Sequence, residues 1–414
     1  MTDPTGRSFL SYRRSCLDDA DLLVAAQRDH GIPTWRDVDD LPGAPTEEEI
    51  RRVLADPQTA SAILWLTEDV EDSPMIRRTE GRLILERALR QDGFFVVPVA
   101  ARGLAYAKAG ELLGPPYSAE DLSGWNLCSF PPGPIGPREA AQIAEKILRG
   151  RLQALHRLPA DEPIRLALST RERAPFRPSQ IALSLDWSGR FAGREARPGV
   201  WEDHLLPALR RVAVEIAAQT HARAVEAEGL ATLPAVAALG CAFLLTRGIA
   251  LSWKQRMAAD GTTQLWNLRA AREASGFAGR TTPGNVRAGD LAVLVSVAET
   301  VDGAFQRSLP DLPPFRAVCR VTKEGKPPHS ILSPGQAADV ARTAIENIKE
   351  ARRGYPEIER IHLFLAVPAG IAMMIGQLLN TLGAVQTYEL VGSTTTGHYR
   401  PAALLDAEAT WQAR

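Results

Sequence analysis

IHLFLAVPAGIAMMIGQLLNTLGAVQTYEL, residues Ile361–Leu390, is the stretch that decides the fold prediction. Its first apolar run, His362–Val367, is continuous, as is typical of a strand buried on both faces. A proline-glycine turn at 368–370 then leads into an apolar helix and a second strand. Proline and glycine interrupt the longer run Leu363–Leu379, whereas a membrane span needs about 20 predominantly apolar residues. The stretch therefore predicts a buried strand-turn-helix-strand unit.

A similar pattern occurs earlier in the chain. The segment Leu233–Gly240 begins with a Pro-Ala pair and ends on a glycine, as Val367–Gly376 does, and each segment follows a long predicted helix. These helices are predicted over Trp201–Ala227 and over Ser333–Arg353, the second capped by its first serine. Buried strands are predicted at Ile181–Leu185 and Leu291–Val297. The repetition suggests two related α/β halves facing each other across a pseudo-dyad, which suits a ring-shaped ligand.

The first hundred residues alternate short apolar runs with amphipathic stretches. Strands are predicted at Ser8–Ser11, Pro33–Arg36, Ala62–Thr67 and Phe94–Ala100, and helices at Leu17–His30, Thr46–Ala55 and Met75–Arg90. This alternation is typical of a parallel, doubly wound sheet. Two proline-rich breaks, Ser129–Pro137 and Leu158–Pro163, flank a helix at Arg138–Leu155. We therefore predict domains over 1–128 and 164–414, joined by a linker with a helix over 129–163.

Composition excludes several classes of protein. The 414 residues contain 48 lysines and arginines against 49 aspartates and glutamates, so nothing favours binding to long nucleic acid or to a membrane. The four cysteines form no C-x-x-C pair and the histidines have no ligand spacing, so no metal site is predicted. The N-terminus lacks the apolar core of a signal peptide, which favours a cytoplasmic location.

Four landmarks, in order, resemble TIR domains over about residues 6–120. The resemblance rests on FLSYRR (Phe9–Arg14), on Trp35–Asp37 followed by Asp40–Gly43, on AILWLT followed by SPMIRRTE (Ser73–Glu80), and on FFVVPVA (Phe94–Ala100). It implies a flavodoxin-like α/β fold. The family contains both signalling scaffolds and NAD⁺ hydrolases, so the fold alone does not decide between them.

The resemblance places the catalytic carboxylate on the helix after the third strand. Glu80 is the best positional match; because Ile76 stands where the family often has tryptophan, Glu86 on the same helix remains the second candidate. A carboxylate beneath the ribose can stabilise the oxocarbenium-like charge that develops as nicotinamide leaves. Without the resemblance, Glu80 would be interpreted as a solvated glutamate beside Arg77 and Arg78.

The remaining NAD⁺-binding candidates lie where strands of such a sheet end. They are Ser11, Tyr12, Arg13, Arg14, Trp35, Asp37, Asp40, Leu41, Pro42 and Gly43. An arginine could bind the pyrophosphate and Tyr12 could stack on a ring, although the arginines could equally be surface residues and Trp35 a core residue. The chain has neither a G-x-G-x-x-G motif at a strand-to-helix turn nor a Walker A lysine. NAD⁺ is therefore expected as a substrate, and no cofactor is expected.

The stretch Ile361–Leu390 closely resembles the last unit of SAVED domains, and Ile181–Arg190 resembles a strand and loop of their first half. The resemblance implies two fused Rossmann-like (CARF-like) halves that bind a cyclic oligonucleotide. A strand end that meets a helix N-terminus also suits a phosphate. The predicted binding residues are Asp186, Trp187, Ser188, Arg190, Lys254, Gln255, Arg256, Val367, Pro368, Ala369 and Gly370.

Together the two resemblances imply a TIR–SAVED effector of cyclic-oligonucleotide-based antiphage signalling (CBASS). In such an effector, a cyclic oligonucleotide, most simply cyclic tri-adenylate, would act as activator and drive head-to-tail self-association into a filament. The TIR domain would then convert NAD⁺ to nicotinamide and ADP-ribose. Two alternatives stay open: a non-enzymatic TIR scaffold that recruits a partner, and a C-terminal half that degrades the cyclic ligand.

Overall fold

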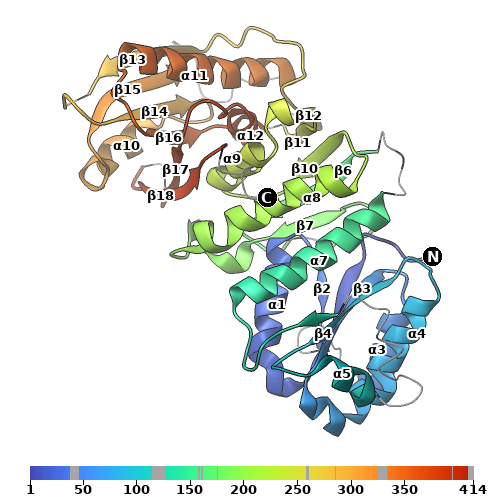
Figure 1. Cartoon of the computed structure of the whole chain (residues 1–414). Helices are drawn as coiled ribbons and strands as arrows, with labels where there is room; N and C mark the ends of the chain where they lie inside the picture. The colour runs from blue at the N-terminus through green and yellow to red at the C-terminus, as the bar shows by residue number, and fades with distance from the viewer. Residues whose placement is uncertain are drawn as a thin grey trace.

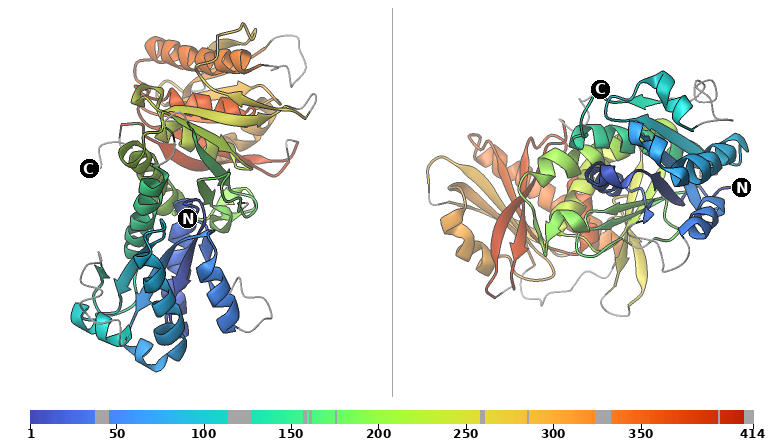
Figure 2. Two further views of the ribbon diagram at one scale, coloured as in Figure 1. Left: turned by 90° about the vertical axis from the view of Figure 1, so that its right-hand side faces the viewer. Right: turned by 90° about the horizontal axis from the view of Figure 1, so that it is seen from below.

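The computed structural model describes residues 1–37, 46–113, 127–156, 159, 162–174, 176–257, 261–284, 286–323, 333–393 and 395–408. Its three large sheets define an N-terminal unit, a first half and a second half of the C-terminal region (Figure 1). The first half lies between the other two, as the perpendicular views also show (Figure 2). In the described ranges, no helix combines the length and the apolar character that crossing a membrane demands.

The N-terminal unit is built on a five-stranded parallel sheet. Its strands are β1 (Arg7–Ser11), β2 (Thr34–Trp35), β3 (Thr59–Leu66), β4 (Phe95–Ala100) and β5 (Cys128–Ser129). The order β2-β1-β3-β4-β5 is that of flavodoxin-like folds, with the reversal between β1 and β3. The sequence predicted the first four strands to within three residues, because runs buried on both faces are easily recognised.

Helices cover both faces of this sheet. They are α1 (Leu17–Asp29), α3 (Thr46–Ala55), α4 (Gly81–Leu89), α5 (Tyr106–Leu113) and α7 (Pro137–Leu155). One apolar core joins α3, α4 and α5 to one face. The core on the other face joins α1 and α7 and continues without a break into the C-terminal region. Helix α7, predicted within a linker, is therefore a packed layer between the N-terminal unit and α8 (Figure 1).

The first half has a mixed five-stranded sheet in the order β12-β11-β10-β6-β7. Its strands are β6 (Ile164–Ser169), β7 (Leu183–Asp186), β10 (Ala224–Glu228), β11 (Ala250–Arg256) and the antiparallel edge strand β12 (Thr263–Trp266). Two helices, α8 (Leu206–Gln219) and α9 (Leu233–Ala242), pack on it. A small hairpin of β8 (Phe191–Ala192) and β9 (Glu195–Ala196) follows β7.

The prediction of one helix over Trp201–Ala227 is wrong at its C-terminal end. Helix α8 stops at Gln219, because Thr220 has extended backbone and its hydroxyl donates to the Ile216 carbonyl at 2.8 Å. In β10, the buried residues Val225 and Ala227 alternate with half-buried neighbours. The alanine-rich composition concealed this short period-two pattern.

The second half repeats this arrangement in a six-stranded sheet of order β13-β15-β14-β16-β17-β18. Its strands are β13 (Ala278–Pro283), β14 (Asp290–Ser296), β15 (Phe315–Thr322), β16 (Ile361–Ala366), β17 (Val385–Val391) and β18 (His398–Leu405). Its helices are α10 (Asp302–Ser308), α11 (Pro334–Gly354) and α12 (Ala369–Gln377). In both halves a central parallel strand, a short apolar helix, a parallel strand and an antiparallel edge strand follow one another.

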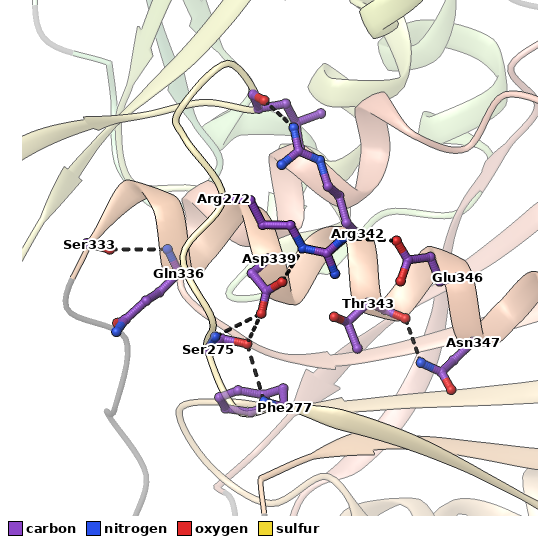
Figure 3. A network of polar contacts seen from close by, with 11 residues as sticks. Arg272, Ser275, Phe277, Ser333, Gln336, Asp339, Arg342, Thr343, Glu346 and Asn347 are labelled. Atoms are coloured by element: carbon purple, nitrogen blue, oxygen red, sulfur yellow. Dashed lines mark hydrogen bonds and ion pairs between the residues drawn. The ribbon is translucent and has the colours of Figure 1, made fainter.

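Polar contacts fix α11 to the segment that precedes β13 (Figure 3). The Arg272 guanidinium lies 2.5 Å from the Asp339 carboxylate, which also accepts bonds from the backbone N–H and the hydroxyl of Ser275 at 2.8 and 2.6 Å. The predicted cap is confirmed, since the Ser333 hydroxyl accepts from the Gln336 N–H at 3.1 Å. These contacts hold the edge strand β13 in place beneath α11.

Helices α9 and α12, which carry the repeated sequence pattern, cross at backbone contact. A Cβ atom on Gly240 would lie 2.0 Å from the Met373 carbonyl oxygen, and one on Gly376 would lie 2.1 Å from the Ala237 carbonyl oxygen. Each glycine faces the partner helix reciprocally. The two halves are thus related by a pseudo-two-fold axis through this crossing, and only glycine fits at the closest approach.

We expect Gly240→Ala to lower the free energy of unfolding by about 2 kcal/mol, because the new methyl group overpacks a backbone contact. An alanine in a helix interior would otherwise be stabilising. The matched control is Gly354→Ala at the end of α11, where a Cβ meets nothing within 4 Å. Urea denaturation of both variants measures the difference. Equal stability of the two variants would contradict the close crossing.

Candidate functional site

Glu80 lies beside the edge of the first sheet at which its strands end. It is the last residue of a π-helical turn, η3 (Met75–Glu80), that leads into α4. π-Helical turns are rare overall, and many of those that occur lie at functional sites. The Glu80 carboxyl faces Ser11, the last residue of β1, and Asp37, which follows β2. In open α/β sheets, ligands bind at this edge, next to the strand at which the order reverses.

The Glu80 carboxyl has no compensating positive charge among the described residues. Its side chain is buried, and burial raises its pKa to about 7; the Ser11 hydroxyl opposes this shift and the Asp37 carboxylate adds to it. An unpaired buried carboxylate is costly, and groups perturbed in this way concentrate at functional sites. The arrangement can therefore stabilise a positively charged group placed between Glu80 and Ser11.

Asp37 lies near this carboxyl, and Tyr12 lies beside Asp37. Burial raises the pKa of the Tyr12 hydroxyl, and the Asp37 carboxylate raises it further. The guanidinium of Arg13 lies 3.6 Å from the Asp69 carboxylate and is partly exposed. Arg14 is exposed in the short helix η1 (Arg14–Cys16). The structure thus brings Ser11 and Asp37 to Glu80, places Tyr12 beside Asp37, and leaves the two arginines towards the rim.

Trp35 belongs to the core of the N-terminal unit. Its ring stacks on Phe9, with ring centroids 4.8 Å apart and planes 10° from parallel, and its side chain is only 2% exposed. It therefore has no open face for a ligand and supports the strand end from below. Asp40, Leu41, Pro42 and Gly43, predicted to close over the nicotinamide, lie outside the described residues.

Glu86 occupies a different environment from Glu80. Its carboxylate lies 2.7 Å from Arg82 Nε, one helical turn away, and the pair is partly exposed on α4. Asp69, which the sequence did not single out, binds Arg13 and accepts a hydrogen bond from the Thr67 hydroxyl. An acidic residue just after a buried strand was the signal that could have indicated it.

The second candidate site lies where the two C-terminal halves meet. The side chain of Gln255, from β11, accepts a hydrogen bond from the backbone N–H of Gly370 at 3.2 Å. This contact joins the end of β11 in the first half to the Val367–Gly370 turn of the second half. A Cβ on Gly370 would lie 2.9 Å from the Trp266 ring, so glycine is needed here. Lys254 pairs with Glu228 at 3.0 Å, and Arg256 is exposed.

A matching contact occurs at the N-terminus of α9. Glu389, from β17, faces the backbone N–H of Leu233 and lies between Arg194 and Arg171. Burial raises the pKa of its carboxyl to about 7, although both arginines and the Leu233 N–H oppose the shift. Sequence reasoning missed these residues; an acidic residue within the apolar strand Val385–Val391 was the available signal.

The loop Asp186–Arg190 lies against the N-terminal unit, apart from the Gln255–Gly370 contact. Trp187 is fully buried, and its indole N–H donates to the Asp29 carbonyl at 3.2 Å. The Arg190 guanidinium binds the Asp29 carboxylate at 2.6 and 3.1 Å. Ser188 donates its hydroxyl proton to Asp186 at 2.6 Å. Trp187 therefore has no face on which a base could stack, contrary to the expectation from its loop position.

The fold is that of a flavodoxin-like unit joined to a duplicated Rossmann-like region, and the C-terminal contacts are those of two halves that cap each other's helices. Residues 206–405, from the start of α8 to the end of β18, match the model of the SAVED family, the "SMODS-associated and fused to various effectors sensor domain". The chain therefore carries a SAVED domain in its C-terminal part. No curated protein matches the chain.

Several solved structures are similar in outline. A Cap4 SAVED/CARF-domain containing receptor from Acinetobacter baumannii, with the cyclic trinucleotide 3′3′3′-cAAA, has 14% sequence identity and a TM-score of 0.49, over 96% of this chain and 100% of that chain. The same receptor with 2′3′3′-cAAA gives a TM-score of 0.48 at the same identity and coverage. The Cap4 receptor from Moraxella osloensis has 14% identity and a TM-score of 0.43, over 95% and 100% of the two chains.

Proposed function

We propose that this chain is a ligand-gated NAD⁺ hydrolase of CBASS antiviral defence, with a TIR domain at its N-terminus and Glu80 as the catalytic residue. The observation that carries the enzymatic half is the buried Glu80 carboxyl, which has no cationic partner among the described residues and faces Ser11 and Asp37. Such a carboxyl suits a substrate that brings its own positive charge. The nicotinamide-ribose end of NAD⁺ does so.

The chemistry requires little from the protein. Cleavage of the nicotinamide–ribose bond releases a neutral leaving group, so no strong general acid is needed. Positive charge develops on the ribose, and the ionised Glu80 carboxylate stabilises it from below. Water then adds to the ribose carbon and releases a proton, which gives ADP-ribose. Binding of the cationic substrate also lowers the pKa of Glu80, so the carboxylate is ionised when it is needed.

The SAVED match supports a cyclic oligonucleotide as the activator, and we propose cyclic tri-adenylate as the first candidate. In each half, a side chain from the other half caps a helix N-terminus, Gln255 at Gly370 and Glu389 at Leu233. Backbone N–H groups at such helix ends suit ligand phosphates. Ligand binding would promote head-to-tail self-association, and one subunit's loop would complete the NAD⁺ site of its neighbour. This arrangement keeps the activity off without ligand.

The purified full-length protein, incubated with NAD⁺ alone and with a panel of cyclic di-, tri- and tetranucleotides, provides the test. We expect NAD⁺ loss with one ligand only, at least 100-fold faster than without it, accompanied by a rise in light scattering. NAD⁺ left untouched with a ligand that binds would favour the TIR scaffold that recruits a partner. Flat light scattering during rapid NAD⁺ loss would contradict activation by assembly. Intact ligand after long incubation would exclude a ligand-degrading C-terminal half.

A further inference from the structure

Glu389 fills an anion-binding position that spans the two halves of the SAVED domain. The N-terminus of α9 lacks a local cap, since the Thr232 hydroxyl at the cap position has no hydrogen-bond partner in the described part of the chain. The Glu389 carboxyl, carried in by β17 from the other half, faces the Leu233 N–H instead. A carboxylate at a helix N-terminus is stabilised in the way that a phosphate would be.

Two arginines complete this position. Arg194 Nε lies 3.8 Å from the Glu389 carboxylate, and Arg194 also donates to the Leu390 carbonyl at 3.4 Å. Burial lowers the pKa of the Arg171 guanidinium, Arg194 lowers it further by repulsion, and Glu389 raises it. The two positive groups are thus close enough to repel each other and need an anion between them. An N-terminal helix end and two guanidinium groups are a typical donor set for phosphate.

The pseudo-symmetric position in the other half is filled by a neutral group. There the Gln255 amide oxygen accepts the Gly370 N–H at the start of α12, with Gln255 on β11, the counterpart of β17. The duplicated fold therefore uses an amide at one helix N-terminus and a carboxylate at the other. A cap needs only an acceptor, so the full negative charge and the two arginines at α9 exceed what capping requires.

Arg194 also lies on the segment that contacts the N-terminal unit. It is in the turn of the β8–β9 hairpin, whose strands pair Phe191 with Ala196. Four residues earlier, Arg190 holds the Asp29 carboxylate at the end of α1 at 2.6 Å. This ion pair borders a groove of about 660 Å³ between α1, α7 and α8. One short segment thus connects Glu389 to the helix that follows β1.

We propose that Glu389 occupies the place of a ligand phosphate in the ligand-free chain, and that its displacement by the ligand frees the β8–β9 hairpin and so signals to α1 through Arg190 and Asp29. This inference rests on the proposed binding of a cyclic oligonucleotide. A phosphate diester and a carboxylate each carry one negative charge, so the exchange keeps Arg171 and Arg194 neutralised.

The first test measures binding of cyclic tri-adenylate, or of whichever panel member binds, by titration calorimetry. We expect Glu389→Gln to bind at least 10-fold more tightly than the unmodified chain, because the competing charge is gone. Arg194→Gln should bind at least 10-fold more weakly. The matched control is Glu195→Gln, an exposed neighbour on the same hairpin, which should bind normally. Circular dichroism confirms that each variant is folded.

An ordinary structural ion pair predicts a different pattern, in which Glu389→Gln and Arg194→Gln weaken binding together. That result, or unchanged affinity in Glu389→Gln, overturns the inference while leaving the proposed function intact. Absence of binding by every panel member, to the unmodified chain and to Glu389→Gln alike, overturns both. The affinity measurement does not depend on NAD⁺ loss, so the two failures are distinguishable.

The second test addresses the connection to the N-terminal unit by hydrogen exchange of the backbone amides. Ligand should change the exchange rate of the hairpin and of the last turn of α1 at least threefold in the unmodified chain. In Arg190→Gln we expect normal affinity and a normal response of the hairpin, but no response in α1. A response in α1 that survives this substitution would exclude the route through Arg190 and Asp29.

Discussion

Glu80→Gln is expected to reduce ligand-stimulated NAD⁺ loss at least 1,000-fold, roughly 4 kcal/mol of transition-state stabilisation, and at the same time to stabilise the protein. The amide keeps the shape of the side chain and removes the negative charge that stabilises the developing cation on the ribose. Binding of the cyclic oligonucleotide should be unchanged, because Glu80 lies in the N-terminal unit. Assays of NAD⁺ loss and ligand affinity on the same preparation separate these effects.

The stability gain follows from the pKa of Glu80, about 7 in the folded chain against 4.5 for an ordinary glutamate. Between these pH values the folded chain holds a proton that the unfolded chain releases, so the free energy of unfolding falls as the pH rises through this window. The loss is complete above pH 7 and amounts to about 3 kcal/mol. Glutamine does not titrate, so Glu80→Gln should be more stable by up to about that amount at pH 8.

Glu86→Gln is the matched control for Glu80→Gln. It removes a partly exposed ion pair with Arg82, which is typically worth less than 1 kcal/mol, and it leaves the charge beside Ser11 in place. We expect nearly normal NAD⁺ loss and a normal dependence of stability on pH. Inactivity of Glu86→Gln together with an active Glu80→Gln would transfer the catalytic role to Glu86.

Arg151→Met is expected to lower the free energy of unfolding by about 3–5 kcal/mol, the largest stability loss we predict for a single side chain. Arg151, on α7, is fully buried and donates to the carbonyls of Thr5, Gly6 and Ala182 at 2.5, 2.6 and 2.8 Å. Methionine fills similar space but leaves three buried acceptors without donors, and each such loss is costly.

This arginine joins the N-terminal unit to the first half, so its loss should also weaken the cooperativity of unfolding. The continuous core between the two predicts one transition for them in the unmodified chain, and Arg151→Met should broaden it or split it in two. Arg138→Met, an exposed change on the same helix, is the control and should cost less than about 0.5 kcal/mol. A comparable loss in the control would contradict a specific role for Arg151.

The sequence predicted local elements well and long-range contacts poorly. Continuous apolar runs located β3 and β4, and the serine-proline start of α11 located its cap, because these signals depend only on neighbouring residues. The repeated Pro-Ala pattern predicted that α9 and α12 are related. It did not predict that the two helices would meet at backbone contact on Gly240 and Gly376, because that contact depends on how the halves pack and not on neighbouring residues.

The contacts that define the sites join residues far apart in the chain. Glu80 meets Ser11 and Asp37, and Gln255 meets Gly370 across 115 positions. Trp187 was assigned to ligand stacking from its loop position, yet it packs beneath α1, because a neighbouring unit covers that loop. The spacing of apolar residues in the sequence does not indicate which surface a second unit will cover. For the same reason, the partners of Asp29 and Glu389 could not be predicted from the sequence.

The crossing of α9 and α12 limits the ways in which the two SAVED halves can move. Backbone atoms meet at Gly240 and Gly376, so a sliding motion would drive each glycine into a neighbouring side chain, whereas a rotation about the crossing disturbs few atoms. A small rotation about the crossing leaves the atoms there nearly in place. The same rotation displaces the distant edges of the two sheets much further, and in the second sheet the edge strand β13 moves the most.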